Sequence, residues 1–100
     1  MRILGIDPGL GATGDGIIED SNFRLVEAGV IRTKPNTPIQ ARIEKIFDEI
    51  SKIIEEYRPE VLVLEKIYSH YKHPTTSILM AHARAMACLV CGKLDVKLVN

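Results

Sequence analysis

The sequence has no tryptophan, only two cysteines and no excess of charge of either sign. Lysine plus arginine and aspartate plus glutamate number 13 each, so the formal net charge is zero. Net charge therefore gives no sign of nucleic-acid binding, and any such function needs a local basic patch. With only Cys88 and Cys91 present, we expect a reducing, cytoplasmic environment.

Long apolar runs are also missing. No stretch of about 18 uninterrupted apolar residues occurs, so we expect no membrane span. The apolar run after Arg2 stops at Asp7, which is too short for a signal peptide. With 100 residues, 46% of them hydrophobic and 26% charged, the sequence predicts a single small domain.

The chain opens with an apolar run that ends in one aspartate and a glycine-rich turn. The run predicts a short buried strand over 2–7, and the proline and glycines of residues 8–14 predict a tight turn with positive φ. Asp7 then lies at the carboxyl end of a strand, where α/β sheets bind ligands and metals. A simple turn-capping role for Asp7 stays open, because aspartate is a favoured turn residue.

Two further strands and a helix follow. We expect a second strand to begin at 16–19 and, after the turn 20–22, a third strand over 23–33, giving three antiparallel strands in sequence. Thr37 to Gln40 carry a capping-box pattern with Pro38 as the first helical residue. Apolar side chains then recur at helical spacing up to Tyr57, and Pro59 closes this helix.

Residues 61–64 are a continuous apolar run, typical of a strand buried on both faces. A right-handed crossover makes this strand parallel to strand 2–7, so Asp7 and Glu65 meet at one edge of the sheet. Paired carboxylates repel and are costly to desolvate, and a divalent cation relieves both costs. We therefore predict a Mg²⁺ or Mn²⁺ site at Asp7 and Glu65. Alternatively, both are exposed beyond their strands, with Lys66 as a partner.

The next segment mixes basic and aromatic side chains: Lys66, Tyr68, His70, Tyr71, Lys72 and His73. Basic groups can contact phosphates and aromatic rings can stack on unpaired bases, so this segment is a candidate for nucleic-acid binding. The alternative is an ordinary polar loop whose tyrosines cover the core. Two histidines at three-residue spacing, without further ligands, do not indicate a metal site.

A late helix, from about Thr76 to Leu94, has no broad polar face. A helix that is apolar all round is buried all round, so a second subunit or the rest of a longer domain should cover its outer side. Cys88 and Cys91 fall late in this helix, which favours packing over a redox role. Gly92 fits a helix stop, and residues 96–99 predict a fifth strand.

This order of elements resembles the ribonuclease H-like fold, an α/β fold with a mixed five-stranded sheet and flanking helices. More narrowly, the chain resembles the RuvC family of Holliday-junction resolvases. The resemblance covers essentially the whole chain and rests on four motifs taken together: Ile3-Leu4-Gly5-Ile6-Asp7-Pro8-Gly9 with Thr13-Gly14, Ile31-Arg32-Thr33, Leu64-Glu65, and His82-Ala83-Arg84.

The resemblance implies a homodimeric, Mg²⁺-dependent endonuclease that resolves four-way DNA junctions by paired nicks, with a branch-migration complex as a partner. Asp7 and Glu65 match the catalytic metal-binding carboxylates of the family, and Tyr68 matches an aromatic residue near the crossover. The helix 76–94 matches the dimer interface, and we group Arg84 with the DNA-binding residues.

Three departures from the family pattern matter. The family continues into a helix with two further acidic metal ligands, which these 100 residues lack. We therefore expect a fragment of one ribonuclease H-like domain, 1–100, with an incomplete site and little or no cleavage. Asp15 replaces a typical aromatic residue, which disturbs strand packing or adds negative charge near the site. Ala85 replaces a usual glycine, which crowds the dimer helix slightly.

Two other function classes stay open. An actin- or sugar-kinase-like ATPase half-domain also opens with a strand, an aspartate and a glycine turn. The chain is too short for its second phosphate loop, and no Walker-type motif occurs. A non-catalytic, dimeric junction-binding module on the same fold needs the basic segment and the dimer, but not a complete set of carboxylates.

Overall fold

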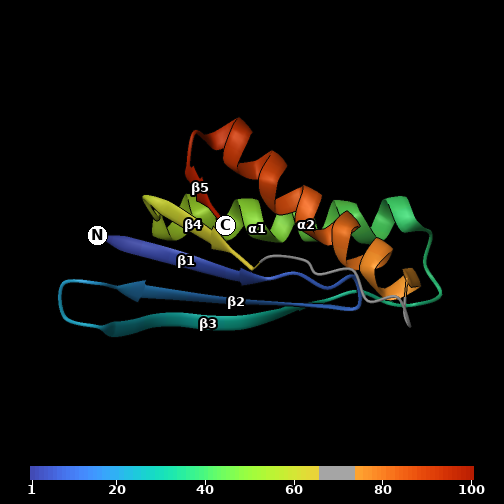
Figure 1. Ribbon diagram of the computed structural model, residues 1–100, viewed down its shortest axis with the longest axis horizontal. Coiled ribbons are helices and arrows are strands. Elements are labelled where there is room, and N and C mark those ends of the chain that lie inside the picture. The colour runs from blue at the N-terminus through green and yellow to red at the C-terminus, as the bar shows by residue number, and fades with distance from the viewer. Residues whose placement is uncertain (66–73) are drawn as a thin grey trace.

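The computed structural model describes residues 1–65 and 74–100. In chain order, its elements are β1 (Arg2–Asp7), β2 (Ala12–Glu19), β3 (Arg24–Arg32), α1 (Ile39–Tyr57), β4 (Val61–Leu64), α2 (Pro74–Leu94) and β5 (Lys97–Val99). The strands form one sheet in the order β3-β2-β1-β4-β5. The first three strands are antiparallel, and β4 is parallel to β1 and to β5. These pairings confirm the predicted mixed five-stranded sheet. Both helices cover the same face of this sheet (Figure 1).

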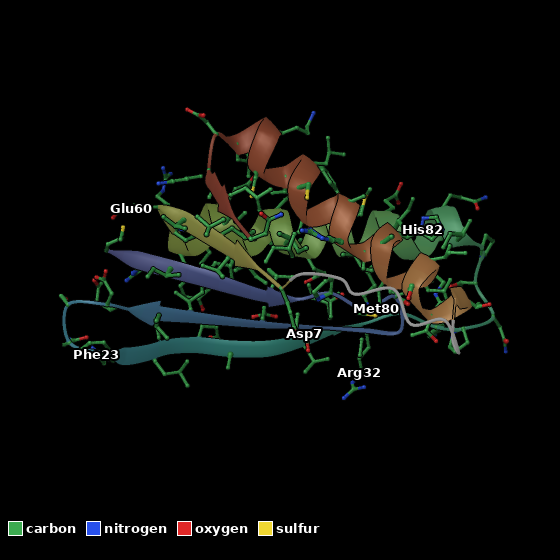
Figure 2. The ribbon with its side chains drawn as sticks, in the orientation of Figure 1. Asp7, Phe23, Arg32, Glu60, Met80 and His82 are labelled. Atoms are coloured by element: carbon green, nitrogen blue, oxygen red, sulfur yellow. The ribbon has the colours of Figure 1, made fainter. Side chains whose placement is uncertain are left out.

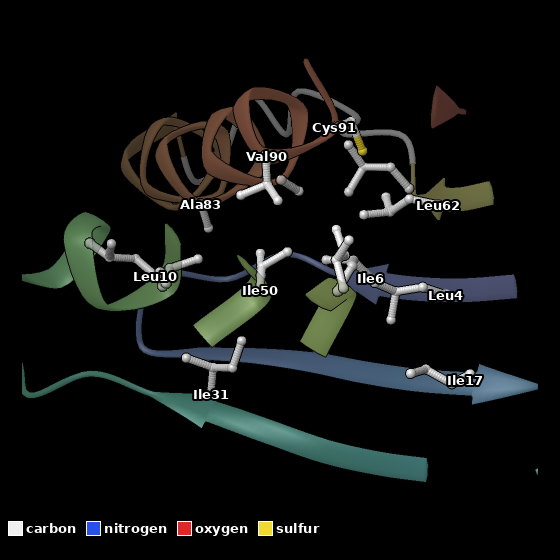
Figure 3. Close-up of a cluster of buried hydrophobic side chains, with 14 residues drawn as sticks. Leu4, Ile6, Leu10, Ile17, Ile31, Ile50, Leu62, Ala83, Val90 and Cys91 are labelled. Atoms are coloured by element: carbon white, nitrogen blue, oxygen red, sulfur yellow. The ribbon is translucent and has the colours of Figure 1, made fainter. Parts of the chain in front are cut away.

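The core lies between the sheet and the two helices (Figure 3). Alternate strand residues point into it, because side chains on a strand alternate between the two faces. From β1 and β4, Leu4 and Leu62 are fully buried, and α1 contributes Ile46 and Ile50. Each such side chain stabilises the fold by about 1.5–3 kcal/mol when it leaves water. The buried hydrophobic side chains are Leu4, Ile6, Leu10, Ile17, Ile31, Ile46, Ile50, Ile54, Leu62, Leu64, Ala83, Ala87, Val90 and Cys91.

The opposite face of the sheet is uncovered by the residues that the structure describes. Ile18 on β2, Leu25 and Val30 on β3 and Val63 on β4 are 38–62% exposed. The prediction that β4 is buried on both faces is therefore wrong for Val63, although Leu62 and Leu64 are buried. The physical reason is that both helices pack on one face only.

The structure corrects the predicted start of α1 and the predicted stop of α2 at Gly92, and it confirms the predicted end of α1. The capping box before α1 does not form, because Pro38 and not Thr37 is the N-cap; the Thr37 hydroxyl donates to the Lys34 carbonyl at 2.7 Å. At its other end α1 stops at Tyr57, one residue before Arg58 takes a left-handed conformation with φ of 49°. The late helix α2 passes through Gly92 and ends at Leu94, before Asp95 with φ of 56°.

Helix α2 buries one side only. Ala83, Ala87 and Val90 are fully buried, whereas Ile78 is 59% and Leu89 is 48% exposed on the outer side. The described residues leave this outer side uncovered, which agrees with the prediction that a second subunit or the rest of a longer domain covers it. The segment Thr75–Leu94 is also long and apolar enough to cross a membrane. A core helix of a folded domain has the same composition, and its inner side here packs in the core.

Candidate active site

Asp7 and Glu65 lie at the carboxyl ends of two neighbouring parallel strands. Ile6 of β1 pairs with Leu64 of β4, and the Glu65 amide donates to the Ile6 carbonyl at 3.4 Å. The carboxylates therefore follow directly after paired residues, and both side chains are exposed. Figure 2 shows Asp7 where the tips of β1 and β4 come together. The prediction that both carboxylates reach the same edge of the sheet is confirmed.

The two acidic residues line one hollow of about 590 Å³ on the sheet surface. Its floor is unusually free of side chains, because Gly5 pairs with Gly16 and Asp7 pairs with Gly14. The hollow is lined by Gly5, Ile6, Asp7, Gly14, Asp15, Gly16, Gly29, Val63 and Glu65. A phosphate backbone can approach such a floor more closely than a surface covered by side chains.

These floor glycines are not required by contacts within the described chain. A Cβ added at Gly5, Gly14 or Gly16 would meet no heavy atom closer than 3.7 Å. None of the glycines has a positive φ, so the sequence-based explanation by backbone conformation is wrong for the turn as well. What these glycines provide is open space beside Asp7.

Gly9 is the exception, and it holds the turn after β1 together. A Cβ on Gly9 would lie 2.5 Å from the Ala12 carbonyl oxygen, so only glycine fits this close approach. The buried Thr13 side chain also fixes this turn, through two hydrogen bonds to Gly9 that we call the Gly9–Thr13 clamp. Its hydroxyl donates to the Gly9 carbonyl at 2.6 Å and accepts from the Gly9 amide at 3.2 Å. The turn that carries Asp7 is therefore compact, and β2 begins at Ala12, earlier than predicted.

Asp15 lies on the helix-covered face, although it is also among the residues that line the hollow. It pairs with Ile6, which is buried against the helices, and with Gly29 of β3. A Cβ on Gly29 would be 3.3 Å from the Asp15 carboxylate, so glycine makes room for this side chain. Burial, and then the negative charge of Glu27, raise the pKa of Asp15.

The donor set at the sheet edge fits one hard cation. Mg²⁺ prefers oxygen ligands and is commonly held by one or two carboxylates together with waters and substrate phosphates. Asp7 and Glu65 supply such a pair over an open floor. Within residues 1–65 and 74–100, no group of three or more histidine, cysteine, aspartate or glutamate side chains is arranged to hold a metal. The residues present therefore match a two-carboxylate site.

Most of the predicted DNA-binding residues fall outside the described part of the chain: Lys66, Tyr68, His70, Tyr71, Lys72 and His73. Their assignment stays a prediction. Arg84 is described and is half-buried on α2. The sequence interpretation missed a second group of cations, Lys34, Arg42 and Lys45, which line a pocket at the start of α1. On helical spacing alone, Arg42 and Lys45 fall on the polar, solvated face of α1, opposite its apolar side chains.

Comparison with known proteins decides the family. The family described as Crossover junction endodeoxyribonuclease RuvC matches residues 3–99, nearly the whole chain. The chain belongs to the RuvC family. This membership gives no support to the ATPase half-domain.

Two RuvC relatives and one solved structure illustrate the match. The chain is 38% identical over 96 residues to crossover junction endodeoxyribonuclease RuvC of Rhodopirellula baltica, covering 94% of this chain and 54% of that relative. To the RuvC of Hydrogenovibrio crunogenus it is 44% identical over 87 residues, covering 85% and 49%. A T. thermophilus RuvC, solved in complex with a Holliday junction substrate, superposes with a TM-score of 0.92 at 23% identity, covering 98% and 62%. The fold is thus that of the RuvC, ribonuclease H-like proteins, and the chain spans about half the length of these curated relatives.

Proposed function

We propose that the protein is a metal-dependent endonuclease that resolves four-way DNA junctions, with Asp7 and Glu65 as catalytic carboxylates. The observation that carries this proposal is the pair of carboxylates at adjacent strand ends over a glycine floor. RuvC family membership supports the choice of substrate, because a T. thermophilus relative was solved with such a junction. Paired carboxylates that neighbour an open floor suit phosphodiester hydrolysis, since the scissile phosphate can approach them directly.

In this proposal the chain's residues hold and orient the reactants. Asp7 and Glu65 would bind Mg²⁺ or Mn²⁺ through their carboxylate oxygens, and the glycine floor would admit the DNA backbone. The bound metal would activate a water and stabilise the leaving oxygen. The Gly9–Thr13 clamp fixes the turn after β1, so the Asp7 carboxylate keeps its position while the DNA strand is cut.

We further propose that two copies associate through α2. Ile78, His82, Ala85 and Leu89 are exposed and recur at helical spacing, so they form one stripe on its outer side. Two active sites related by a two-fold axis match the paired nicks that resolution of a four-way junction requires. We infer cytoplasmic location because both cysteines are free, and a branch-migration complex as partner because the RuvC resemblance implies it.

Single carboxylate substitutions test the catalytic assignment. In the protein at its natural length, Asp7→Asn or Glu65→Gln should reduce Mg²⁺-dependent cutting of a mobile four-way junction at least about 100-fold, the scale on which losing one charge-stabilising group lowers kcat. Junction binding without metal should change by less than about threefold. Asp48→Asn, an exposed carboxylate on α1, is the matched control and should cut normally. Equal cutting by all three variants would show that Asp7 and Glu65 are not catalytic residues.

A second candidate function is a junction-binding module that does not cut. The specific observation in its favour is that the described residues present two carboxylates at the site and no group of three. Retained junction binding with no cutting by the natural protein, at any Mg²⁺ or Mn²⁺ concentration, would favour this module over the endonuclease.

A further inference from the structure

A small basic pocket lies between the end of β3 and the first turns of α1, apart from the residues that line the Asp7 and Glu65 hollow. Its volume is about 170 Å³, enough for a tetrahedral anion, since one water takes about 30 Å³ of liquid. It is lined by Thr33, Lys34, Thr37, Ala41, Arg42 and Lys45. Three of these six carry positive charge, and none is acidic.

Arg42 is fixed in this pocket by a chain of hydrogen bonds. Its Nε donates to the Thr33 hydroxyl at 2.9 Å, and that hydroxyl donates to the Leu10 carbonyl at 2.5 Å. A guanidinium has five N–H donors in a rigid fork, so most of them remain for another acceptor. Because Arg42 is half-buried and held from one side, its free donors are oriented before any ligand arrives.

Lys45 is fixed in a similar way, and no carboxylate neutralises either cation within the described residues. The Lys45 Nζ donates to the Arg32 carbonyl at 2.6 Å, which uses one of its three donors. The ion pairs found in residues 1–65 and 74–100 involve Met1 and Lys52, not Lys34, Arg42 or Lys45. A half-buried guanidinium without a counter-charge favours binding of an anion.

The start of α1 adds to the positive potential of the pocket. Its first turn contains no acidic residue, and its N-cap, Pro38, offers no side-chain cap. The first amides of a helix lack intrahelical partners and carry the positive end of its dipole. Three features therefore converge on one small volume, beside the start of the helix: an oriented guanidinium, an oriented ammonium and an exposed lysine.

The pocket is linked directly to the candidate active site. The carbonyl that anchors Arg42 through Thr33 belongs to Leu10, in the same turn that Asp7 opens. The next residue, Gly11, accepts from the Thr33 amide at 3.0 Å. Figure 1 shows this turn and the beginning of α1 toward the same end of the molecule. A ligand in the pocket therefore lies at the far side of the turn that carries Asp7.

We propose that this pocket binds a backbone phosphate of the DNA strand that passes through the active site. A phosphodiester offers two unesterified oxygens, which match the free donors of Arg42 and Lys45. Binding there would hold the strand at a fixed distance from Asp7 without reading its sequence. The inference rests on the proposed function, and it adds a site for the strand outside the carboxylate hollow.

The test compares two double variants that remove the same charge. Lys34→Gln with Lys45→Gln alters the pocket, whereas Lys52→Gln with Lys93→Gln removes two exposed lysines elsewhere on the two helices. Binding of the protein at its natural length to a four-way junction and to a plain duplex is measured without metal, across a salt series. Circular dichroism checks the folding of each variant, and Lys34→Gln alone serves if the pocket double variant unfolds.

The salt dependence gives the decisive result. Each lost phosphate contact should reduce the slope of log Kd against log salt by about 1, so the pocket variant should show a shallower slope for both DNAs, with affinity about 5- to 10-fold weaker at low salt. The control variant should keep the wild-type slope. Equal slopes for the two variants would overturn the pocket as a strand site.

The outcomes also separate this inference from the proposed function. An unchanged slope with normal junction cutting would reject the pocket and leave the endonuclease standing. A reduced slope in a protein that neither cuts nor prefers junctions would keep the pocket and reject the resolvase. If inorganic phosphate shifts the NMR signals of Ala41 and Arg42 while the DNA slope stays unchanged, the pocket is a free-anion site and the strand assignment is wrong.

Discussion

At the scale of single residues, Asp15 is a carboxylate whose surroundings disfavour its charged form. It is half-buried on the helix-covered face, beside Gly29 and near the negative charge of Glu27. Burial, together with Glu27, raises the pKa of Asp15, so the folded state disfavours its charged form. The resulting destabilisation is absent below the unfolded pKa and grows as pH rises through the folded pKa.

Asp15→Asn should therefore stabilise the protein at pH 7 by about 0.5–1 kcal/mol, a typical size for a single favourable substitution. The gain should shrink as pH falls through the raised pKa of Asp15, because the wild-type side chain then becomes neutral. Urea unfolding followed by circular dichroism at several pH values measures this difference. Asp48→Asn, at an exposed position on α1, is the control substitution and should change the free energy of unfolding at pH 7 by less than about 0.5 kcal/mol. An equal gain at every pH would show that burial of charge is not the cause.

Thr13 is the second residue whose role is local and testable. Its fully buried hydroxyl bonds to both the amide and the carbonyl of Gly9. Thr13→Val keeps the shape but removes both bonds, which should lower the free energy of unfolding by about 1–3 kcal/mol. Thr37→Val removes only an exposed bond to Lys34 and should cost less than about 0.5 kcal/mol in the same unfolding assay. A similar cost for both variants would contradict the clamp.

At the scale of elements, α1 shows how burial follows periodicity. Ile50 is fully buried, whereas Ile39 at the helix start is 42% exposed. Ile50→Ala should destabilise the fold by about 2–5 kcal/mol, because it leaves a cavity in the core. Ile39→Ala should cost less than about 1 kcal/mol. Chemical denaturation of both variants measures the loss in the free energy of unfolding. Equal losses would mean that the apolar side of α1 is not packed as described.

Periodicity and chain connectivity were enough to predict the elements that position the site. The apolar runs predict β1 and β4, the crossover rule makes them parallel, and Asp7 and Glu65 then reach one edge. Contacts between distant residues were beyond such reasoning. Spacing places Arg42 on the polar face of α1, because nothing local shows that its guanidinium reaches Thr33, whose hydroxyl donates to the Leu10 carbonyl. The capping box failed for a related reason: the helix begins with Pro38 as its N-cap, so the Thr37 hydroxyl accepts no helix amide and instead donates to the Lys34 carbonyl.

At the scale of the whole molecule, two apolar surfaces remain uncovered by the described residues. One is the open sheet face with Leu25, Val30 and Val63, and the other is the outer side of α2. Exposed apolar patches of this kind mark interaction surfaces. The α2 stripe is the one that lies on a single rigid element, so a second copy can pack against it in a symmetric way.

A charge placed in this stripe tests the dimer. Wild-type protein should show concentration-dependent dimers in analytical ultracentrifugation, and Leu89→Asp should weaken association at least about 10-fold, or 1.4 kcal/mol, because each interface would bury two unpaired carboxylates. Phe23→Asp, at the β2–β3 turn where Figure 2 shows Phe23, is the matched control. It removes a more exposed apolar side chain, 88% accessible, and should leave the dimer intact. A wild type that stays monomeric at all concentrations, or equal weakening by both variants, would exclude α2 as the interface. The paired active sites that the proposed junction resolution requires would then have to be brought together through another surface.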